Sequence, residues 1–215
     1  MANKNGRKSS IIKDALSLTI ITLICSFALA FVYEITKGPI AAQADAKKNA
    51  GYQVVFKNAQ SLATDEELLQ LVSETDLSTI DASYAGVKID DIVQALDANG
   101  NLIGYIVKSN ARGYAGTITV AVGYSLDGVV QGMEILAISD TPGFGLELTN
   151  KEFKDKFAGV KTNQFVLTKG SASKDSDIDV YSGATITSTA VVNAVNAGLG
   201  FLIENAEGLG GVANE

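Results

Sequence analysis

The residues best suited to chemistry lie in one polar turn, from Asp179 to Ser188, which leads into an apolar run from Thr189 onward. The turn carries hydroxyl side chains at Ser182, Thr185, Thr187 and Ser188. Gly183 allows a positive φ or the close approach of another group, and Ala184 leaves that approach open. A turn of this composition can hold a phosphate.

The apolar run after this turn predicts the helix that positions it. Apolar side chains recur there at helical spacing, at Val191, Val192, Val195, Leu199 and Leu202. We predict a helix over residues 189–206 with Thr187 or Ser188 as its N-cap, and its N-terminus directs free backbone N–H groups toward an anion. An ordinary serine- and threonine-rich N-cap has the same pattern, so the residues alone leave both interpretations open.

A second segment of interest follows a predicted strand, at residues 140–145. Pro142 and Gly143 stiffen and then reverse the chain. Gly143 and Gly145 expose backbone that can lie against a flat ring, and the Phe144 ring can pack on its face. A Pro-Gly turn after a strand is also a common structural feature, so this segment alone does not decide between structure and function.

Three segments of the chain resemble, in order and spacing, the motifs of the FMN-binding domain family. Asp-x-x-Ser-Gly-Ala-Thr at residues 179–185 is similar to its flavinylation motif, and upstream lie Gly-Tyr-Ala-Gly-Thr-Ile at 113–118 and Asp-Thr-Pro-Gly-Phe-Gly at 140–145. The last motif usually has Glu-Thr-Pro-Gly-Leu-Gly in the family, so this chain differs at Asp140 and Phe144. The resemblance extends over residues 84–206.

This resemblance implies FMN as the cofactor, joined through its phosphate to the Thr185 hydroxyl by a separate, magnesium-dependent flavin transferase. It implies that Ser182, Gly183 and Ala184 form the backbone recess at the attachment point, and that Asp179 is part of what the transferase recognises. The other residues expected to contact FMN are Thr187, Thr141, Pro142, Gly143, Phe144 and Gly145. No metal site is predicted.

The composition excludes several classes of enzyme. The 215 residues contain no histidine, so a Ser-His-Asp or Cys-His nucleophile system and a histidine-ligated metal or haem site are impossible. A hydrolase with Thr185 or Ser182 as nucleophile needs a lysine base, and nothing near Lys169 or Lys174 in the sequence marks either as one. The single Cys25 cannot form a disulfide within the chain.

An apolar segment near the N-terminus predicts a membrane anchor. From Ala15 to Tyr33 no charged residue occurs, and a helix of this length spans roughly 28 Å, close to the hydrocarbon core of a bilayer. The basic residues before it predict a cytoplasmic N-terminus and an extracytoplasmic domain; they are Lys4, Arg7, Lys8 and Lys13. Because Ala28-Leu29-Ala30 has the pattern of a cleavage site, a cleaved signal peptide is the alternative.

The charge of the chain is distributed unevenly. Of 17 basic and 24 acidic side chains, 4 and 1 lie in residues 1–33, which leaves 13 and 23 in the remainder, a net charge of −10. An acidic outer domain repels the phosphates of nucleic acid, so no nucleic-acid partner is predicted.

The predicted fold class is α+β: a single N-terminal transmembrane helix followed by an extracytoplasmic antiparallel sheet packed with helices. Two hairpins are expected, 92–96 with 102–107 and 117–124 with 129–138, each around a turn that contains aspartate and glycine. Further helices are expected at 40–59, 64–72 and 150–157. The plan is a cytoplasmic N-terminus (1–14), the transmembrane helix (15–33), a helical connector (34–83), an FMN-binding domain (84–207) and a C-terminal tail (208–215).

At this length the chain is most similar to the G subunit of Rnf electron transport complexes. The C subunit of the sodium-translocating NADH:quinone reductase shares the plan but is usually longer. The resemblance implies an electron carrier with covalently bound FMN that works with the other membrane subunits of an ion-translocating ferredoxin:NAD oxidoreductase and is not a complete catalyst alone. A cofactor-free, membrane-anchored extracytoplasmic binding or assembly module is the alternative of another class.

Overall fold

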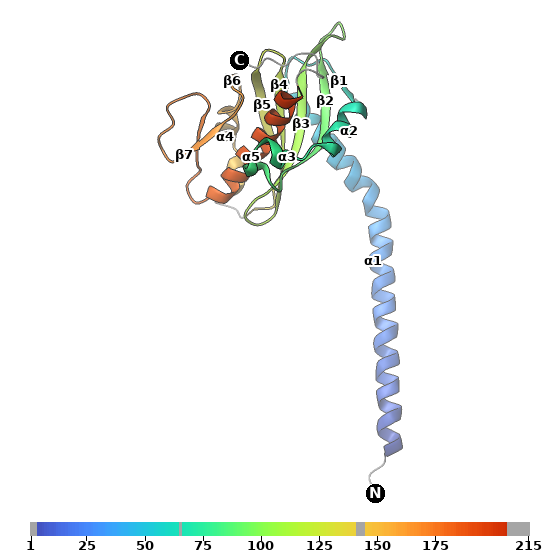
Figure 1. Ribbon diagram of the computed structural model, residues 1–215. Helices are drawn as coiled ribbons and strands as arrows, with labels where there is room; N and C mark the ends of the chain where they lie inside the picture. Colours follow the sequence, from blue (N-terminus) through green and yellow to red (C-terminus); the bar gives the residue numbers. More distant parts are fainter. Residues whose placement is uncertain (1–3, 65, 141–144, 206–215) are drawn as a thin grey trace. The chain divides into compact units, whose positions relative to one another are not determined.

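The computed structural model describes residues 4–64, 66–140 and 145–205 (Figure 1). The chain forms two compact units with their boundary between Lys47 and Lys48. Helix α1, Lys4–Val55, contributes to both units, because its last turns from Lys48 onward belong to the second.

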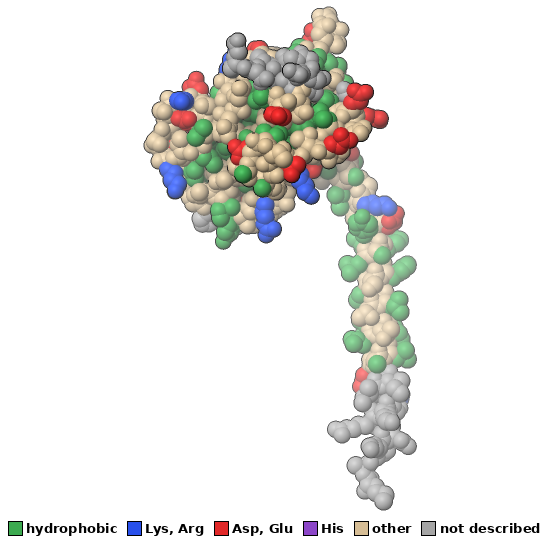
Figure 2. Space-filling model, viewed as in Figure 1, with side chains coloured by type: hydrophobic (Ala, Val, Ile, Leu, Met, Phe, Trp, Pro, Cys, Tyr) green, Lys and Arg blue, Asp and Glu red, His purple; other side chains and the backbone are tan. Residues whose placement is uncertain are grey.

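The first unit is an apolar helix. Large hydrophobic side chains between Leu16 and Tyr33 are exposed along α1 (Figure 2). The most apolar 18-residue stretch of this helix has a mean hydropathy of 2.4, so α1 is long and apolar enough to cross a membrane. The predicted N-terminal apolar helix is therefore confirmed. It continues through Pro39, so the helix expected over 40–59 is part of α1 and ends at Val55.

The second unit is built on an antiparallel sheet of six strands whose order in space is their order in the sequence. The strands are β1 Ser61–Thr64, β2 Lys88–Leu96, β3 Leu102–Arg112, β4 Thr117–Ser125, β5 Val129–Ala137 and β6 Val160–Lys161. Pairing of β2 with β3 and of β4 with β5 confirms both predicted hairpins and the α+β class. The edge strands β1 and β6 were not predicted because they are too short to show alternation.

Helix α5, Thr185–Glu204, covers one face of this sheet and lies against β3 and β4 (Figure 1). Strand side chains that share this face, among them Val107 and Val122, belong to the same core as the helix residues Val191, Val195 and Leu199. By composition α5 is also apolar enough to cross a membrane, but 72% of its apolar stretch is buried in the domain. It is the central core helix.

The end of α1 packs on the opposite face of the sheet. Tyr52 and Val55 of α1, with Phe56 just beyond it, form a second core with strand residues of the other alternation phase, namely Val93, Ala95, Ile106, Ala121 and Leu136. The strand backbone comes very close here, since a Cβ on Gly123 would lie 2.6 Å from the Val55 carbonyl oxygen. The end of the anchor helix is thus part of the folded domain.

Short elements complete the domain. They are α2 Glu66–Glu74, α3 Leu77–Ile80, the 3₁₀ helices η1 Ala82–Tyr84 and η2 Gly145–Thr149, α4 Lys151–Asp155, and the parallel pair β7 Val166–Thr168 and β8 Asp177–Asp179. Helix α2 confirms the prediction at 64–72, and α4 is shorter than the predicted 150–157.

The start of α5 differs from the prediction. The helix begins at Thr185 rather than Thr189, and its N-cap is Ala184, which makes no side-chain cap hydrogen bond. The prediction of Thr187 or Ser188 as N-cap was therefore wrong. Both hydroxyls have partners outside the helix: Thr187 Oγ1 donates to Asp140, and Ser188 Oγ accepts from the Tyr181 N–H at 3.2 Å.

Candidate functional site

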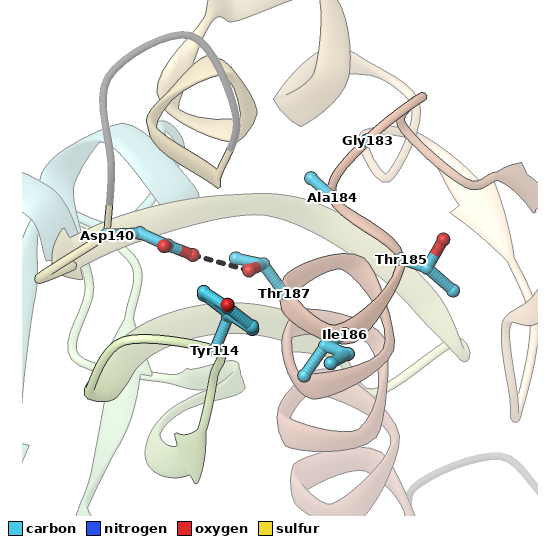
Figure 3. A pocket seen from close by; sticks show the side chains of 7 residues that line it. All are labelled: Tyr114, Asp140, Gly183, Ala184, Thr185, Ile186 and Thr187. Atoms are coloured by element: carbon cyan, nitrogen blue, oxygen red, sulfur yellow. Dashed lines mark hydrogen bonds between the residues drawn. The ribbon is translucent and has the colours of Figure 1, made fainter.

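A hollow of about 460 Å³ opens at the N-terminus of α5 (Figure 3). Its lining residues are Tyr114, Asp140, Gly183, Ala184, Thr185, Ile186 and Thr187. Three elements meet there: the turn between β3 and β4, the end of the segment after β5, and the first turn of α5 with the residues before it. The structure thus brings the flavinylation-like motif together with both upstream motifs.

The turn into α5 depends on glycine. Gly183 has φ = 81°, in the left-handed region that glycine adopts without steric cost. The Ala184 N–H then donates to the Tyr181 carbonyl at 2.9 Å and closes the turn. The first intrahelical bond is the one from the Ser188 N–H to the Ala184 carbonyl, at 2.8 Å, so the N–H groups of the first turn have no acceptor within the helix.

Two threonines of this first turn have opposite environments. The Thr185 side chain is exposed, and in Figure 3 it points away from Asp140 and Tyr114. The Thr187 side chain is 1% exposed and its hydroxyl is hydrogen-bonded to the Asp140 carboxylate. Of the two hydroxyls, that of Thr185 is the accessible one, whereas that of Thr187 connects α5 to the segment that follows β5. Thr187 also lines the hollow, and its expected contact with FMN stays a prediction.

Asp140 has a specific place in this site. Its carboxylate lies so close to Gly145 that a Cβ on that glycine would be 2.0 Å from Oδ2. Gly145 opens η2 and is buried. The short side chain of Asp140, in place of the family's usual glutamate, therefore fits between the Gly145 backbone and Thr187. Gly145 is needed here for the approach of this carboxylate.

Asp179 lies at the end of β8, and its carboxylate is directed into the loop that follows β7. Oδ1 accepts from the Thr168 hydroxyl at 2.5 Å and from the Gly170 N–H at 2.9 Å. The hydrogen bond from Thr168, followed by those from backbone N–H groups of Gly170, Ala172 and Ser171, lowers the pKa of Asp179. The side chain thus organises the loop beside the motif.

The remaining predicted site residues fall into two groups. Ser182 is exposed in the turn before Gly183 and is absent from the lining of the hollow. Thr141, Pro142, Gly143 and Phe144 lie outside the described residues.

Sequence reasoning missed two lining residues, Tyr114 and Ile186. Their side chains are 72% and 53% exposed, unusually so for large apolar groups, and both border the hollow in Figure 3. Tyr114 lies between two glycines in the 113–118 motif, and that position was the available signal. Ile186 carries no local signal, because it fits the helical pattern equally well.

The residues present suit FMN. The hollow has the volume of a small-molecule site, which is typically about 300–1,000 Å³. Tyr114 and Ile186 offer an aromatic and an aliphatic surface for a flat ring. The exposed Thr185 hydroxyl and the free N–H groups of the helix N-terminus suit a phosphate.

Two protein families match this chain. The FMN-binding domain family matches residues 113–200, and the family described as the RnfG N-terminal region matches residues 1–55. The chain is similar to the G subunit of the ion-translocating oxidoreductase complex of Shewanella amazonensis, with 30% identity over 92% of this chain and 91% of that protein.

Two further relatives differ in the ion that their names give. The G subunit of the Na(+)-translocating ferredoxin:NAD(+) oxidoreductase complex of Acetobacterium woodii is 29% identical over 86% of this chain and 88% of that protein. The G subunit of the proton-translocating complex from Clostridium ljungdahlii is 29% identical over 89% of this chain and 91% of that protein.

Among solved structures, Shewanella oneidensis NqrC has a TM-score of 0.46 and 19% identity, covering 68% of this chain and 69% of NqrC.

Proposed function

Because the chain belongs to the family of G subunits of ion-translocating oxidoreductase complexes, we propose that it is an electron-carrier subunit that holds FMN through an ester bond between the FMN phosphate and Thr185. The observation that carries this proposal is the exposed Thr185 hydroxyl at the N-terminus of α5, beside an apolar hollow and within a segment that matches the FMN-binding domain family.

The redox chemistry belongs to the bound FMN, which accepts and donates electrons. The protein residues hold and orient it. The turn at Gly183 presents the Thr185 hydroxyl, and the N-terminus of α5 stabilises the negative charge of the phosphodiester. Tyr114 and Ile186 bound the space for the ring and shield it from water. The bond between Thr187 and Asp140 fixes the wall on the side of β5.

The chain is anchored in a membrane by α1. We propose that its N-terminus is cytoplasmic, because four basic residues precede the apolar segment, and that the FMN domain is extracytoplasmic. Its partners are then the other membrane subunits of an Rnf-type ferredoxin:NAD oxidoreductase, and a flavin transferase during maturation. A sodium-translocating NADH:quinone reductase, in which this chain takes the place of the C subunit, is the related alternative.

Intact mass and peptide mapping of the protein extracted from its native membrane test the proposal. Ester formation joins a hydroxyl and a phosphate with net loss of one water, so we expect a mass increase equal to FMN less one water, located on Thr185. An unmodified peptide would instead favour a cofactor-free membrane-anchored module.

Substitution of the threonines tests the position of the bond. Thr185→Ala is expected to abolish flavin fluorescence in a denaturing gel and to leave the unfolding midpoint within the range of the wild type, because this side chain is exposed. Thr187→Ser keeps a hydroxyl for Asp140 and is the matched control, with normal loading expected. Persistent fluorescence of Thr185→Ala would place the bond on another residue.

A further inference from the structure

A second hollow, also of about 460 Å³, shares part of its lining with the first. It lies between the first turns of α5, the end of β3 and the segment around η1. Thr185 and Ile186 line both hollows. The charged residue among those lining this second hollow is Arg112.

The backbone of Arg112 is held firmly. It is the last residue of β3 and pairs with Thr117 at the start of β4. Directly after it, the Gly113 N–H donates to the Gly116 carbonyl at 2.8 Å and closes the turn that carries Tyr114. The position from which the guanidinium extends is therefore fixed by the same hairpin that supplies Tyr114 to the first hollow.

The guanidinium of Arg112 is free to bind a ligand. Its side chain is exposed, and it forms no salt bridge within the part of the chain that the structure describes. The chain has one other arginine, Arg7, which precedes the apolar segment of α1. Arg112 is therefore the single arginine of the domain, which otherwise carries lysines and an excess of acidic side chains.

The guanidinium of an arginine is suited to bind the FMN phosphate, which the proposed function places beside Thr185. A planar guanidinium binds two phosphate oxygens at once, which a lysine ammonium does not do. An acidic domain repels a negatively charged ligand, so a fixed positive charge beside the attachment point offsets that repulsion. The N-terminus of α5, which begins at Thr185, also favours a negative charge here.

We propose that Arg112 is a positioning residue that binds the phosphate of FMN and holds it beside Thr185. This inference rests on the proposed function and adds to it a residue outside the flavinylation-like motif. It also divides the site by chemistry: Arg112 and the helix N-terminus contact the phosphate, and Tyr114 and Ile186 contact the ring.

Binding of free flavins to the full-length chain, produced without a flavin transferase, tests this assignment. FMN and riboflavin share the ring and the ribityl chain and differ in the phosphate. Flavin fluorescence titrations in detergent are expected to show that the wild type binds FMN more tightly than riboflavin. Arg112→Gln is expected to weaken FMN binding about threefold to tenfold, as for loss of a charge-assisted bond at an accessible site, and to leave riboflavin binding unchanged.

Two variants serve as controls. Lys88 lines a neighbouring hollow together with Arg112 and is absent from the lining around Thr185, so Lys88→Gln removes the same charge nearby and is expected to keep the preference for FMN. Arg112→Lys keeps the charge without the planar fork and is expected to keep part of the preference. Raising the salt concentration is expected to reduce the preference of the wild type and to have no such effect on Arg112→Gln.

Covalent loading gives a second and independent measurement. With a flavin transferase co-expressed at a limiting level, intact mass is expected to show a smaller loaded fraction for Arg112→Gln than for Lys88→Gln, at equal unfolding midpoints. Equal FMN preference and equal loading of these two variants would overturn the role of Arg112, as would a wild type without preference for FMN over riboflavin. A wild type that is never modified at Thr185 would overturn the proposed function instead.

Discussion

The two faces of the sheet are covered by helices that make contact in different ways. On one face α5 lies along β3 and β4 with most of its length buried, and Gly198 of the helix is the point of close approach, where a Cβ would lie 3.2 Å from Val107. On the other face the last turns of α1 insert a few large side chains, and the close approach is made by a strand glycine, Gly123. A long contact distributes its stability over many residues, whereas a short contact depends on few.

The largest effect is expected from removing the short contact. A chain that begins at Lys48 keeps Tyr52, Val55 and Phe56 and is expected to fold as a soluble domain. A chain that begins at Lys57 lacks all three side chains, which are at most 2% exposed. Its free energy of unfolding is expected to fall by more than about 5 kcal/mol, which is enough to unfold a domain of ordinary stability. Circular dichroism and urea unfolding of the two truncated chains measure the difference. A cooperative transition in the shorter chain would show that the second core is dispensable.

The second-largest loss of stability is expected on the α5 face, from Asn196→Ala. The buried Asn196 side chain accepts from the Phe165 N–H and donates to the Phe165 carbonyl, both at 2.8 Å, so its loss leaves two buried backbone groups without partners. We expect a loss of roughly 2–4 kcal/mol in urea unfolding. Asn193→Ala, one turn earlier with an exposed bond to the Ser83 carbonyl, is the control and should cost under about 1 kcal/mol. Equal losses would contradict the importance of burial.

Adding one methyl group on each face compares the two close approaches directly. Gly123→Ala places a Cβ against the Val55 backbone and is expected to destabilise by about 1–3 kcal/mol. Gly198→Ala meets valine side chains at 3.2 Å or more, and the better helix propensity of alanine offsets most of that crowding. Denaturant midpoints of the two variants should therefore differ clearly. A more stable Gly123→Ala protein would mean that α1 does not approach the strands so closely.

The smallest effect concerns pH. Burial, followed by the charge of Asp91 and a hydrogen bond to it, raises the pKa of Tyr52, which lies well beyond the apolar segment 15–33. Because the folded state then holds a proton that the unfolded state loses near pH 10, stability falls as the pH rises above that value. Tyr52→Phe should reduce this alkaline slope. Burial also raises the pKa values of Tyr84 and Tyr124 on the α5 face, so part of the slope should remain, and an unchanged slope would exclude Tyr52 as its source.

The fold was predictable where local pattern and turn chemistry agree. Both long hairpins were found because their strands are apolar and are joined by short turns that contain aspartate and glycine. The strands β1, β6, β7 and β8, of two to four residues, are too short to carry a period, and their pairing is decided by tertiary contacts.

The site was predictable in its motif and not in its geometry. The turn at Gly183 was expected from residue type, and Gly183 does have the positive φ. The start of α5 was placed four residues late, because hydroxyl side chains such as those of Thr187 and Ser188 are typical of an N-cap, whereas here they lie inside the helix. The partner of Thr187 is 47 residues away in the sequence, so no local pattern reveals that its hydroxyl is already engaged.

The position of α5 after every other helix and strand of the described residues has a consequence for biosynthesis. Thr185 opens α5, and α5 packs on β3 and β4, so we expect this hydroxyl to have its final surroundings only when the helix lies on the paired strands. A nascent or truncated chain that lacks α5 thus offers a modifying enzyme no finished substrate. If the flavin is added to this turn, the yellow colour of a molecule records that its polypeptide extended through α5 and was folded when the cofactor was added.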